Sequence, residues 1–293
     1  MARIEHIRRR AAQGVVEAVM TEPEKGASFK ELEQQGWTSK ASGYAAWLGG
    51  ITSGAADPLL DATHVTRGTR LLDVASGPGY GAARATARGA TAIGIDFAPS
   101  MVEHARRHFP QTQFAEGDAE NLAFDDGSFN AVICAFGLLH MAEPDRAIAE
   151  AFRVLGAGGH YAFTVWSTPD RHEFFELVLG AIREHGRLDV PLPPAPSLFR
   201  FSDPVESRKV LASTGFDAIT VTEIPLVWRC ASAQDAVEVI YKSTVRTAML
   251  LEQQTAEERQ RIHQAIMDGA TRFRQGGGYA MAFPAVLVAG HKS

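Results

Sequence analysis

Three aspartates that follow short strand-like runs are the residues of this sequence best placed for chemistry. Asp73 and Asp96 each close a mostly apolar run, and Asp118 stands just beyond a third short run, 113–116. Short apolar runs predict buried strands, and open α/β folds bind their ligands at the carboxyl edge of a parallel sheet. Three carboxylates at that edge predict a site for a ligand with hydroxyl or amino groups to donate.

The turn after Asp73 contains Gly77, Gly79 and Gly81. Glycines remove side chains that would keep a ligand from the backbone, and N–H groups at the start of the next helix stay available as donors. The spacing from Gly77 to Ala82 also satisfies the dinucleotide fingerprint, so an NAD(P)-dependent oxidoreductase is one interpretation. Its pyrophosphate would be repelled by the Asp73 carboxylate, whereas an ammonium group would be attracted. A third interpretation is that Asp73 only caps its own turn.

The stretch from Asp73 to Gly81 closely resembles the first motif of the class I S-adenosylmethionine-dependent methyltransferases. Residues 36–166 follow that family motif by motif, and they are similar to its ubiquinone and menaquinone biosynthesis type. The resemblance implies S-adenosyl-L-methionine as the cofactor, S-adenosyl-L-homocysteine as the product and a small molecule as the methyl acceptor. A non-catalytic S-adenosylmethionine-binding protein would keep the same motifs and stays open as an alternative.

The resemblance gives each strand end a role. Asp73 is expected at the methionine end of the cofactor, Asp96 at the ribose and Asp118 at the adenine amine. Spacing supports the ribose role, because Asp96 lies 23 positions after Asp73 and an acid at about that distance binds ribose hydroxyls in nucleotide sites. The residues expected to bind the cofactor are Tyr44, Asp73, Ala75, Gly77, Pro78, Gly79, Asp96, Phe97, Met101, Gly117, Asp118, Ala119, Ala135 and Phe136.

His140 is the candidate catalytic residue. It lies near the end of the region 122–141, which resembles the family's fourth motif, although an acid often stands there where this chain has Asn130. A sulfonium methyl donor is already activated, so the protein's tasks are alignment, exclusion of water and, where needed, removal of the acceptor's proton. Histidine suits the last task. Capping of the next helix or simple packing is the other interpretation of His140.

Aromatic side chains are expected around the acceptor. They favour a flat or partly apolar molecule, and oxygen, nitrogen and carbon acceptors all stay open. Each aromatic residue would also serve as a packing anchor. The residues expected in the acceptor pocket are Trp37, Trp47, His140, Trp166 and Trp228.

The order of strands and helices predicts an α/β fold with a doubly wound Rossmann-like sheet, mostly parallel with an antiparallel last strand, plus a helical lid insertion. We expect an N-terminal arm or helix over 1–35, the cofactor-binding core over 36–170, and the rest of the sheet over 171–293, with lid helices at about 171–215 and 232–275. The last two strands are expected at 218–227 and 279–289, paired antiparallel. Ser100 and Glu103 predict a capping box on the helix of Met101.

Composition limits the partners. A net charge of −5 argues against nucleic acid, because affinity for phosphates comes from clustered Lys and Arg. No apolar run is long enough to span a bilayer, and Cys134 and Cys230 show no metal-ligand spacing. We therefore expect no metal, no membrane and a reduced, cytoplasmic protein. A homodimer through 232–275 is an alternative use of that insertion, and Met20 is an alternative start to Met1.

Overall fold

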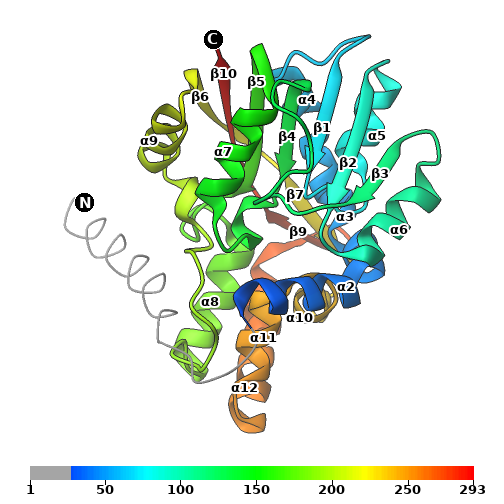
Figure 1. Cartoon of the computed structure of the whole chain (residues 1–293). Helices are drawn as coiled ribbons and strands as arrows, with labels where there is room; N and C mark the ends of the chain where they lie inside the picture. Colours follow the sequence, from blue (N-terminus) through cyan, green and yellow to red (C-terminus); the bar gives the residue numbers. More distant parts are fainter. Residues whose placement is uncertain (1–27) are drawn as a thin grey trace.

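The computed structural model describes residues 28–293, whose strands and helices alternate around a central sheet (Figure 1). The part of the expected N-terminal arm over residues 1–27, and with it the alternative start at Met20, lies outside the described residues. Between residues 28 and 293, no helix combines the length and apolar character needed to cross a bilayer.

Seven strands form the main sheet, in the order β3-β2-β1-β4-β5-β10-β6. β1 to β5 are parallel, whereas β10 runs antiparallel to both of its neighbours, β5 and β6. This confirms the predicted doubly wound sheet with an antiparallel last strand. The strand order reverses at β1, so the carboxyl ends of β1 and β4 border the crevice in which such folds bind ligands. The strands are β1 Arg70–Val74, β2 Thr91–Asp96, β3 Gln113–Glu116, β4 Phe129–Ala135, β5 Leu155–Trp166, β6 Asp217–Ile224 and β10 Ala285–Lys292.

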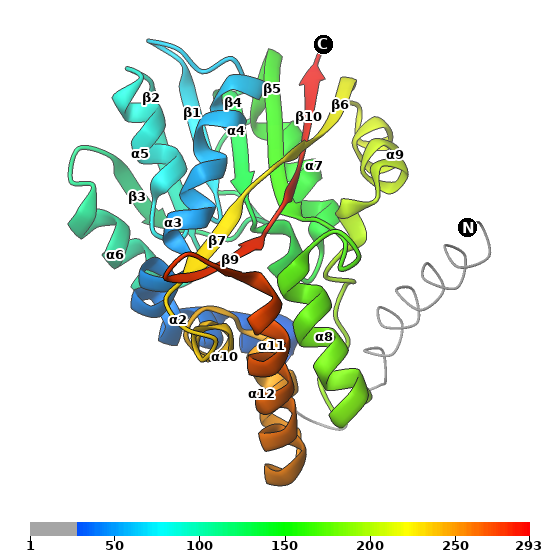
Figure 2. The same cartoon turned by 180° about the vertical axis from the view of Figure 1, so that it is seen from behind.

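Helices cover both faces of this sheet. The two views show α4 and α5 on one face and α7 and α9 on the other (Figures 1 and 2). α6 packs against β2 and β3. Because both faces are covered at the centre of the sheet, β1 and β4 are buried along most of their length. The edge strand β6, in contrast, alternates in polarity and is largely exposed. These helices are α4 Ala56–Ala62, α5 Tyr80–Ala87, α6 Pro99–His108, α7 Pro144–Val154 and α9 Pro204–Thr214.

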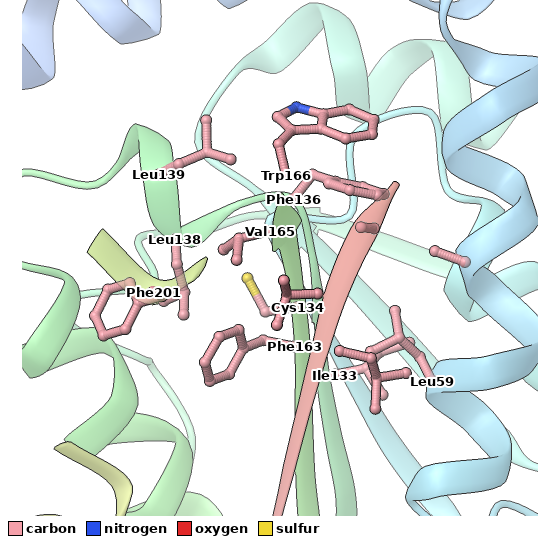
Figure 3. Packing of buried hydrophobic residues seen from close by; sticks show 14 of the residues in the cluster. Leu59, Ile133, Cys134, Phe136, Leu138, Leu139, Phe163, Val165, Trp166 and Phe201 are labelled. Atoms are coloured by element: carbon pink, nitrogen blue, oxygen red, sulfur yellow. The ribbon is translucent and has the colours of Figure 1, made fainter. Parts of the chain in front are cut away.

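The core around β4 and β5 is shown in Figure 3. Ile133 and Phe163 have no exposed surface, and Cys134 beside them is only 1% exposed. The Phe163 ring meets Phe201 edge to face, with centroids 5.7 Å apart. Cys134 is a free thiol that fills core space as a small apolar side chain.

A second sheet of three strands, in the order β7-β9-β8, is absent from the sequence-based prediction. The prediction of two continuous strands at 218–227 and 279–289 is wrong, because each divides between the main and the small sheet. Pro225 and Pro284 lie at the two breaks, and proline has no N–H with which to continue a ladder. The predicted antiparallel pairing is confirmed for β6 and β10. The small sheet consists of β7 Val227–Cys230, β8 Arg274–Gln275 and β9 Gly278–Ala282.

The remaining long helices gather beyond the carboxyl ends of the parallel strands (Figures 1 and 2). α2 packs against α6 and α10, and α8 packs against α12. α2 runs without a break across positions 35 and 36, where the expected segments divide. α9 packs on β6 and α7, so this part of the expected lid segment 171–215 belongs to the sheet layers. These helices are α2 Phe29–Trp47, α8 Glu173–His185, α10 Asp235–Ser243, α11 Arg246–Glu252 and α12 Ala256–Ala270, and α3 Gly49–Thr52 joins α2 to the core.

The predicted capping box at the start of α6 is wrong. Ala98 is the N-cap and makes no side-chain hydrogen bond, while Pro99 takes the first helical position. Ser100 Oγ instead donates a 2.7 Å hydrogen bond to the Thr38 carbonyl on α2. The serine therefore joins α6 to α2, a tertiary contact that its spacing to Glu103 does not reveal.

Two glycines of the turn after β1, Gly77 and Gly79, allow a matched pair of alanine substitutions. Gly79 has a φ of +92°, and a Cβ there would lie 2.6 Å from the Phe114 ring and 2.9 Å from Ala105. Gly77 has a φ of +50° but open space around its Cβ position. We expect Gly79→Ala to lower the free energy of unfolding by about 2–4 kcal/mol through strain and overpacking, and Gly77→Ala by only about 1 kcal/mol. Urea unfolding of the ligand-free protein measures both, and equal losses would contradict this account.

Candidate active site

One cavity at the carboxyl edge of the sheet brings together most of the predicted site residues. It is bordered by the ends of β1, β2 and β4, the loop after β3, and helices α2, α8 and α11. The predicted residues that line it are Tyr44, Asp73, Ala75, Gly77, Pro78, Asp96, Phe97, Met101, Gly117, Asp118, Ala119, Ala135 and Phe136, with Trp37, His140 and Trp166 on the acceptor side.

Three predicted residues do not line this cavity. Gly79 is the left-handed N-cap of α5, and its Cα hydrogens face Phe114 rather than the ligand space. Trp228 on β7 is buried, with its ring 5.7 Å from that of Phe174. Trp47, at the end of α2, packs against the hydrophobic core. Gly79 therefore shapes the turn, whereas Trp228 and Trp47 contribute to packing.

Only one of the two oxygens of the Asp73 carboxylate accepts a hydrogen bond from a described residue. Its Oδ2 accepts a 2.8 Å hydrogen bond from the Ala82 N–H in the first turn of α5, so the acid does cap its own turn. Its Oδ1 is buried and has no partner among the described residues. The side chain is 1% exposed, and burial raises its pKa to about 7 despite the bond from Ala82. A buried oxygen of this kind is stabilised by a cation or a hydrogen-bond donor that enters the cavity.

Asp96 ties the glycine turn to β2. Its Oδ2 accepts from the Gly77 N–H at 2.8 Å, and its Oδ1 accepts from the Ala98 N–H at 2.9 Å. Burial raises the pKa of this carboxyl to about 6, and the two backbone bonds oppose that rise. Each carboxylate oxygen has a second lone pair, so Asp96 can still accept hydrogen bonds from two hydroxyl groups of a ligand.

The loop after β3 carries an ion pair that sequence analysis missed. Lys30 Nζ on α2 lies 2.7 Å from Asp118 Oδ2 and 2.6 Å from Glu120 Oε2. Asp118 Oδ1 accepts from the Glu120 N–H at 3.0 Å. Lys30 and Glu120 both line the cavity, so the lysine holds the start of α2 against the expected adenine end.

Two residues without the freedom of glycine adopt left-handed backbone conformations at the cavity. Ala75 has a φ of +54° just after β1, and Phe136 a φ of +56° just after β4. Such conformations cost roughly 1–3 kcal/mol and concentrate at ligand sites. Next to Ala75, Ser76 Oγ is buried and makes no hydrogen bond to a described residue. The strain and the free hydroxyl are both consistent with a backbone shaped for a ligand.

The acceptor side combines aromatic and charged groups. Phe136 and Trp166 are stacked, with ring centroids 4.0 Å apart and planes 25° from parallel, and Figure 3 shows one ring above the other. His140 Nδ1 lies 2.9 Å from Glu33 Oε2 on α2. Arg246 of α11 also lines this side. Sequence analysis missed Glu33 and Arg246, although Lys30, Glu33 and Trp37 have the spacing of one helix face.

Comparisons with known proteins show which proteins this chain is similar to. Residues 72–163 match the family model described as a methyltransferase domain. A demethylmenaquinone methyltransferase of Clavibacter sepedonicus is 40% identical over 35% of this chain and 43% of its own length. An uncharacterised methyltransferase of Mycobacterium tuberculosis is 35% identical over 48% of this chain and 51% of its own. The chain thus spans about half the length of the curated relatives it matches.

Solved structures show the same fold. The YcgJ protein of Bacillus subtilis aligns with a TM-score of 0.51 and 19% identity, covering 81% of this chain and 97% of that protein. Phosphoethanolamine N-methyltransferase 2 of Haemonchus contortus aligns with a TM-score of 0.50 and 16% identity, covering 81% of this chain and 52% of the other. The fold and the matched domain confirm the resemblance to class I S-adenosylmethionine-dependent methyltransferases.

Asp73 gives a prediction about pH and stability. The pKa of its carboxyl rises from 3.8 to about 7 in the folded protein, so its contribution to stability is complete below 3.8 and is lost as the pH rises through 7. We expect the stabilising effect of Asp73→Asn on the ligand-free protein to grow by roughly 2 kcal/mol between about pH 5.5 and about pH 8. Chemical denaturation at both pH values measures this, and a pH-independent effect would refute the burial argument.

Proposed function

We propose that this protein transfers a methyl group from S-adenosyl-L-methionine to a small-molecule acceptor. The observation that carries the proposal is the buried Oδ1 of Asp73, a cavity residue, which has no hydrogen-bond partner among residues 28–293. The ammonium group of the cofactor's methionine part would supply the missing positive donor there. Ser76 also lines the cavity, and its Oγ likewise has no partner in the described part of the chain, so it is a second polar atom available there.

The rest of the cofactor would follow the order of the strand ends. Asp96 would accept hydrogen bonds from the ribose hydroxyls, while Phe97 and Met101 line the same wall of the cavity. Asp118 and the backbone of Ala119 would receive the adenine. Lys30 pairs with Asp118 in this structure, so the lysine would close the adenine end rather than bind a phosphate. A nicotinamide dinucleotide is disfavoured because its pyrophosphate would face Asp73.

The cofactor supplies an activated methyl group bound to a positively charged sulfur. The chain's own part is to hold the acceptor in line with that bond and to exclude water. Trp37, Phe136, Trp166 and Phe175 present apolar rings to the cavity, which favours a flat, partly apolar acceptor. The Clavibacter sepedonicus relative is a demethylmenaquinone methyltransferase, which supports a flat, partly apolar acceptor for this chain as well.

Ligand titrations test the cofactor assignment. We expect saturable binding of S-adenosylhomocysteine to the wild type and no saturable binding of NADH. Asp73→Asn should weaken S-adenosylhomocysteine binding by about 10- to 100-fold, because a buried charged hydrogen bond is lost. The same variant should bind 5′-methylthioadenosine, which lacks the amino-acid tail, within about twofold of wild type. Isothermal titration calorimetry measures all three ligands.

The matched control is Asp125→Asn, the same chemical change at an exposed carboxylate. It should bind every ligand as the wild type does. Saturable binding of NADH with none of S-adenosylhomocysteine would overturn the proposal in favour of an oxidoreductase. Binding of the sulfonium cofactor without S-adenosylhomocysteine release in a broad acceptor screen would favour a non-catalytic binding protein.

A further inference from the structure

The strongest feature of the site that the proposed function leaves unused is a buried acid paired with His140. We propose that Glu33 and His140 form a proton-accepting pair, that Glu33 is its positioning residue, and that the acceptor it serves carries an aromatic hydroxyl group. This inference rests on the proposed methyl transfer and adds to it the chemical class of the acceptor.

The two residues come from distant parts of the chain. Glu33 lies on α2 and His140 ends the short 3-10 helix η2, Leu138–His140, which follows β4. His140 Nδ1 is 2.9 Å from Glu33 Oε2, and Trp37 Nε1 donates to the same oxygen at 2.9 Å. The Trp37 ring also meets the His140 ring edge to face, with centroids 4.7 Å apart. Glu33 thus fixes Trp37 and His140, which both line the cavity, from behind its wall.

This arrangement selects one tautomer of His140. Trp37 Nε1 can only donate, so Glu33 Oε2 acts as an acceptor, and His140 Nδ1 donates its proton to that oxygen. In the neutral ring the other nitrogen, Nε2, then carries a free lone pair. Nε2 makes no hydrogen bond to any residue from 28 to 293, and His140 lines the cavity. The atom left without a partner is therefore the one that can accept a proton.

The burial of Glu33 indicates that this carboxylate does more than link α2 to the loop after β4. Its side chain is 1% exposed, and its second oxygen, Oε1, has no partner among the described residues. Burying a carboxylate is costly unless opposite charge or donors compensate it. Burial lowers the pKa of Arg246, and the charge of Glu33 opposes that shift. Among the described residues, however, no ion pair joins the two side chains. A positive charge that forms on His140 during reaction would complete the compensation.

Surrounding groups point to an aromatic hydroxyl. A neutral amine attacks a sulfonium methyl group with its own lone pair, whereas a hydroxyl is a weak nucleophile until its proton leaves. The stacked rings of Phe136 and Trp166 lie in the same cavity as His140 and offer a flat apolar surface. A base beside such a surface fits a phenol better than an aliphatic amine.

The step balances without another reactant. As the phenolic oxygen forms its bond to the methyl carbon, the S–CH3 bond breaks and its electron pair stays on sulfur as a neutral thioether. The hydroxyl proton passes to His140 Nε2, and the imidazolium charge is offset by Glu33. The products are an aryl methyl ether, S-adenosylhomocysteine and a proton, which His140 later returns to solvent.

Two phenols of different acidity test the pair. Assays with saturating S-adenosylmethionine use 4-nitrophenol, which is largely ionised in mildly alkaline buffer, and 4-methoxyphenol, which keeps its proton. We expect the wild type to methylate both. With 4-methoxyphenol, kcat should fall by at least about 100-fold in His140→Gln and by roughly 10- to 100-fold in Glu33→Gln. With 4-nitrophenol both variants should lose less than about threefold, and KM should hold within about twofold.

Glu31→Gln is the matched control, because it makes the same change on the exposed face of α2 and glutamine also serves in a capping box. It should keep wild-type rates with both phenols. Equal losses with the two phenols in Glu33→Gln would show a purely structural role and overturn the proposal, as would undiminished turnover of 4-methoxyphenol. Failure of the wild type to methylate either phenol, with intact S-adenosylhomocysteine binding, would reject the acceptor class and leave the proposed function standing. Absence of that binding would instead reject the proposed function.

A spectroscopic test needs no acceptor. Nitrogen-15 NMR of histidine-labelled, ligand-free protein at a pH where the ring is neutral should show His140 protonated at Nδ1, with its signal identified by its loss in His140→Gln. Protonation at Nε2 instead would overturn the assignment of the base.

Discussion

The burial of two carboxylates at the end of the parallel sheet is the constraint on which the site depends. Asp73 and Asp96 are almost fully covered, and burial raises the pKa of both. Asp73 accepts a hydrogen bond from the N–H of Ala82 in α5. Asp96 accepts from the N–H groups of Gly77, in the glycine turn, and of Ala98, just before α6. The carboxyl groups that would contact a ligand therefore also fix the conformation of the glycine turn beside it. A site with two buried carboxyl groups, one of whose oxygens has no partner among residues 28–293, is suited to a ligand with a positive group and several donors.

Helix α2 completes the site from the opposite side. Lys30, Glu33, Trp37 and Tyr44 lie along one of its faces, and together they reach three parts of the site. Lys30 reaches the loop after β3, Glu33 and Trp37 reach His140, and Tyr44 lines the space near Asp96. Ser100 of α6 adds a hydrogen bond to the α2 backbone. Docking of this one helix would therefore cover the cofactor and assemble the proposed base at the same time.

The fold was largely predictable because its signals are local. β2 and β3 have the bounds that their apolar runs indicate, and the glycine turn lies between β1 and α5 as expected. Prediction failed for two different reasons, a proline inside a strand-like run and a tertiary contact in place of a local one. The segments around Pro225 and Pro284 are strand-like throughout, yet the chain divides each between two sheets, because proline cannot donate to a continuous ladder. Ser100 has capping-box spacing but bonds to another helix.

The sequence by itself determined the order of the acids along the sheet edge, since each stands at the end of its own strand and parallel strands end at one edge. Only the tertiary structure decided which side chains pair across the cavity. Glu33 and His140 are 107 positions apart. The sequence made His140 a candidate, but nothing in the local pattern of Glu33 distinguishes it from an ordinary charge on a helix. The same holds for Trp228, whose packing against Phe174 keeps it away from the cavity. Such pairings depend on how separate elements dock, and docking is a property of the whole hydrophobic core rather than of residue spacing.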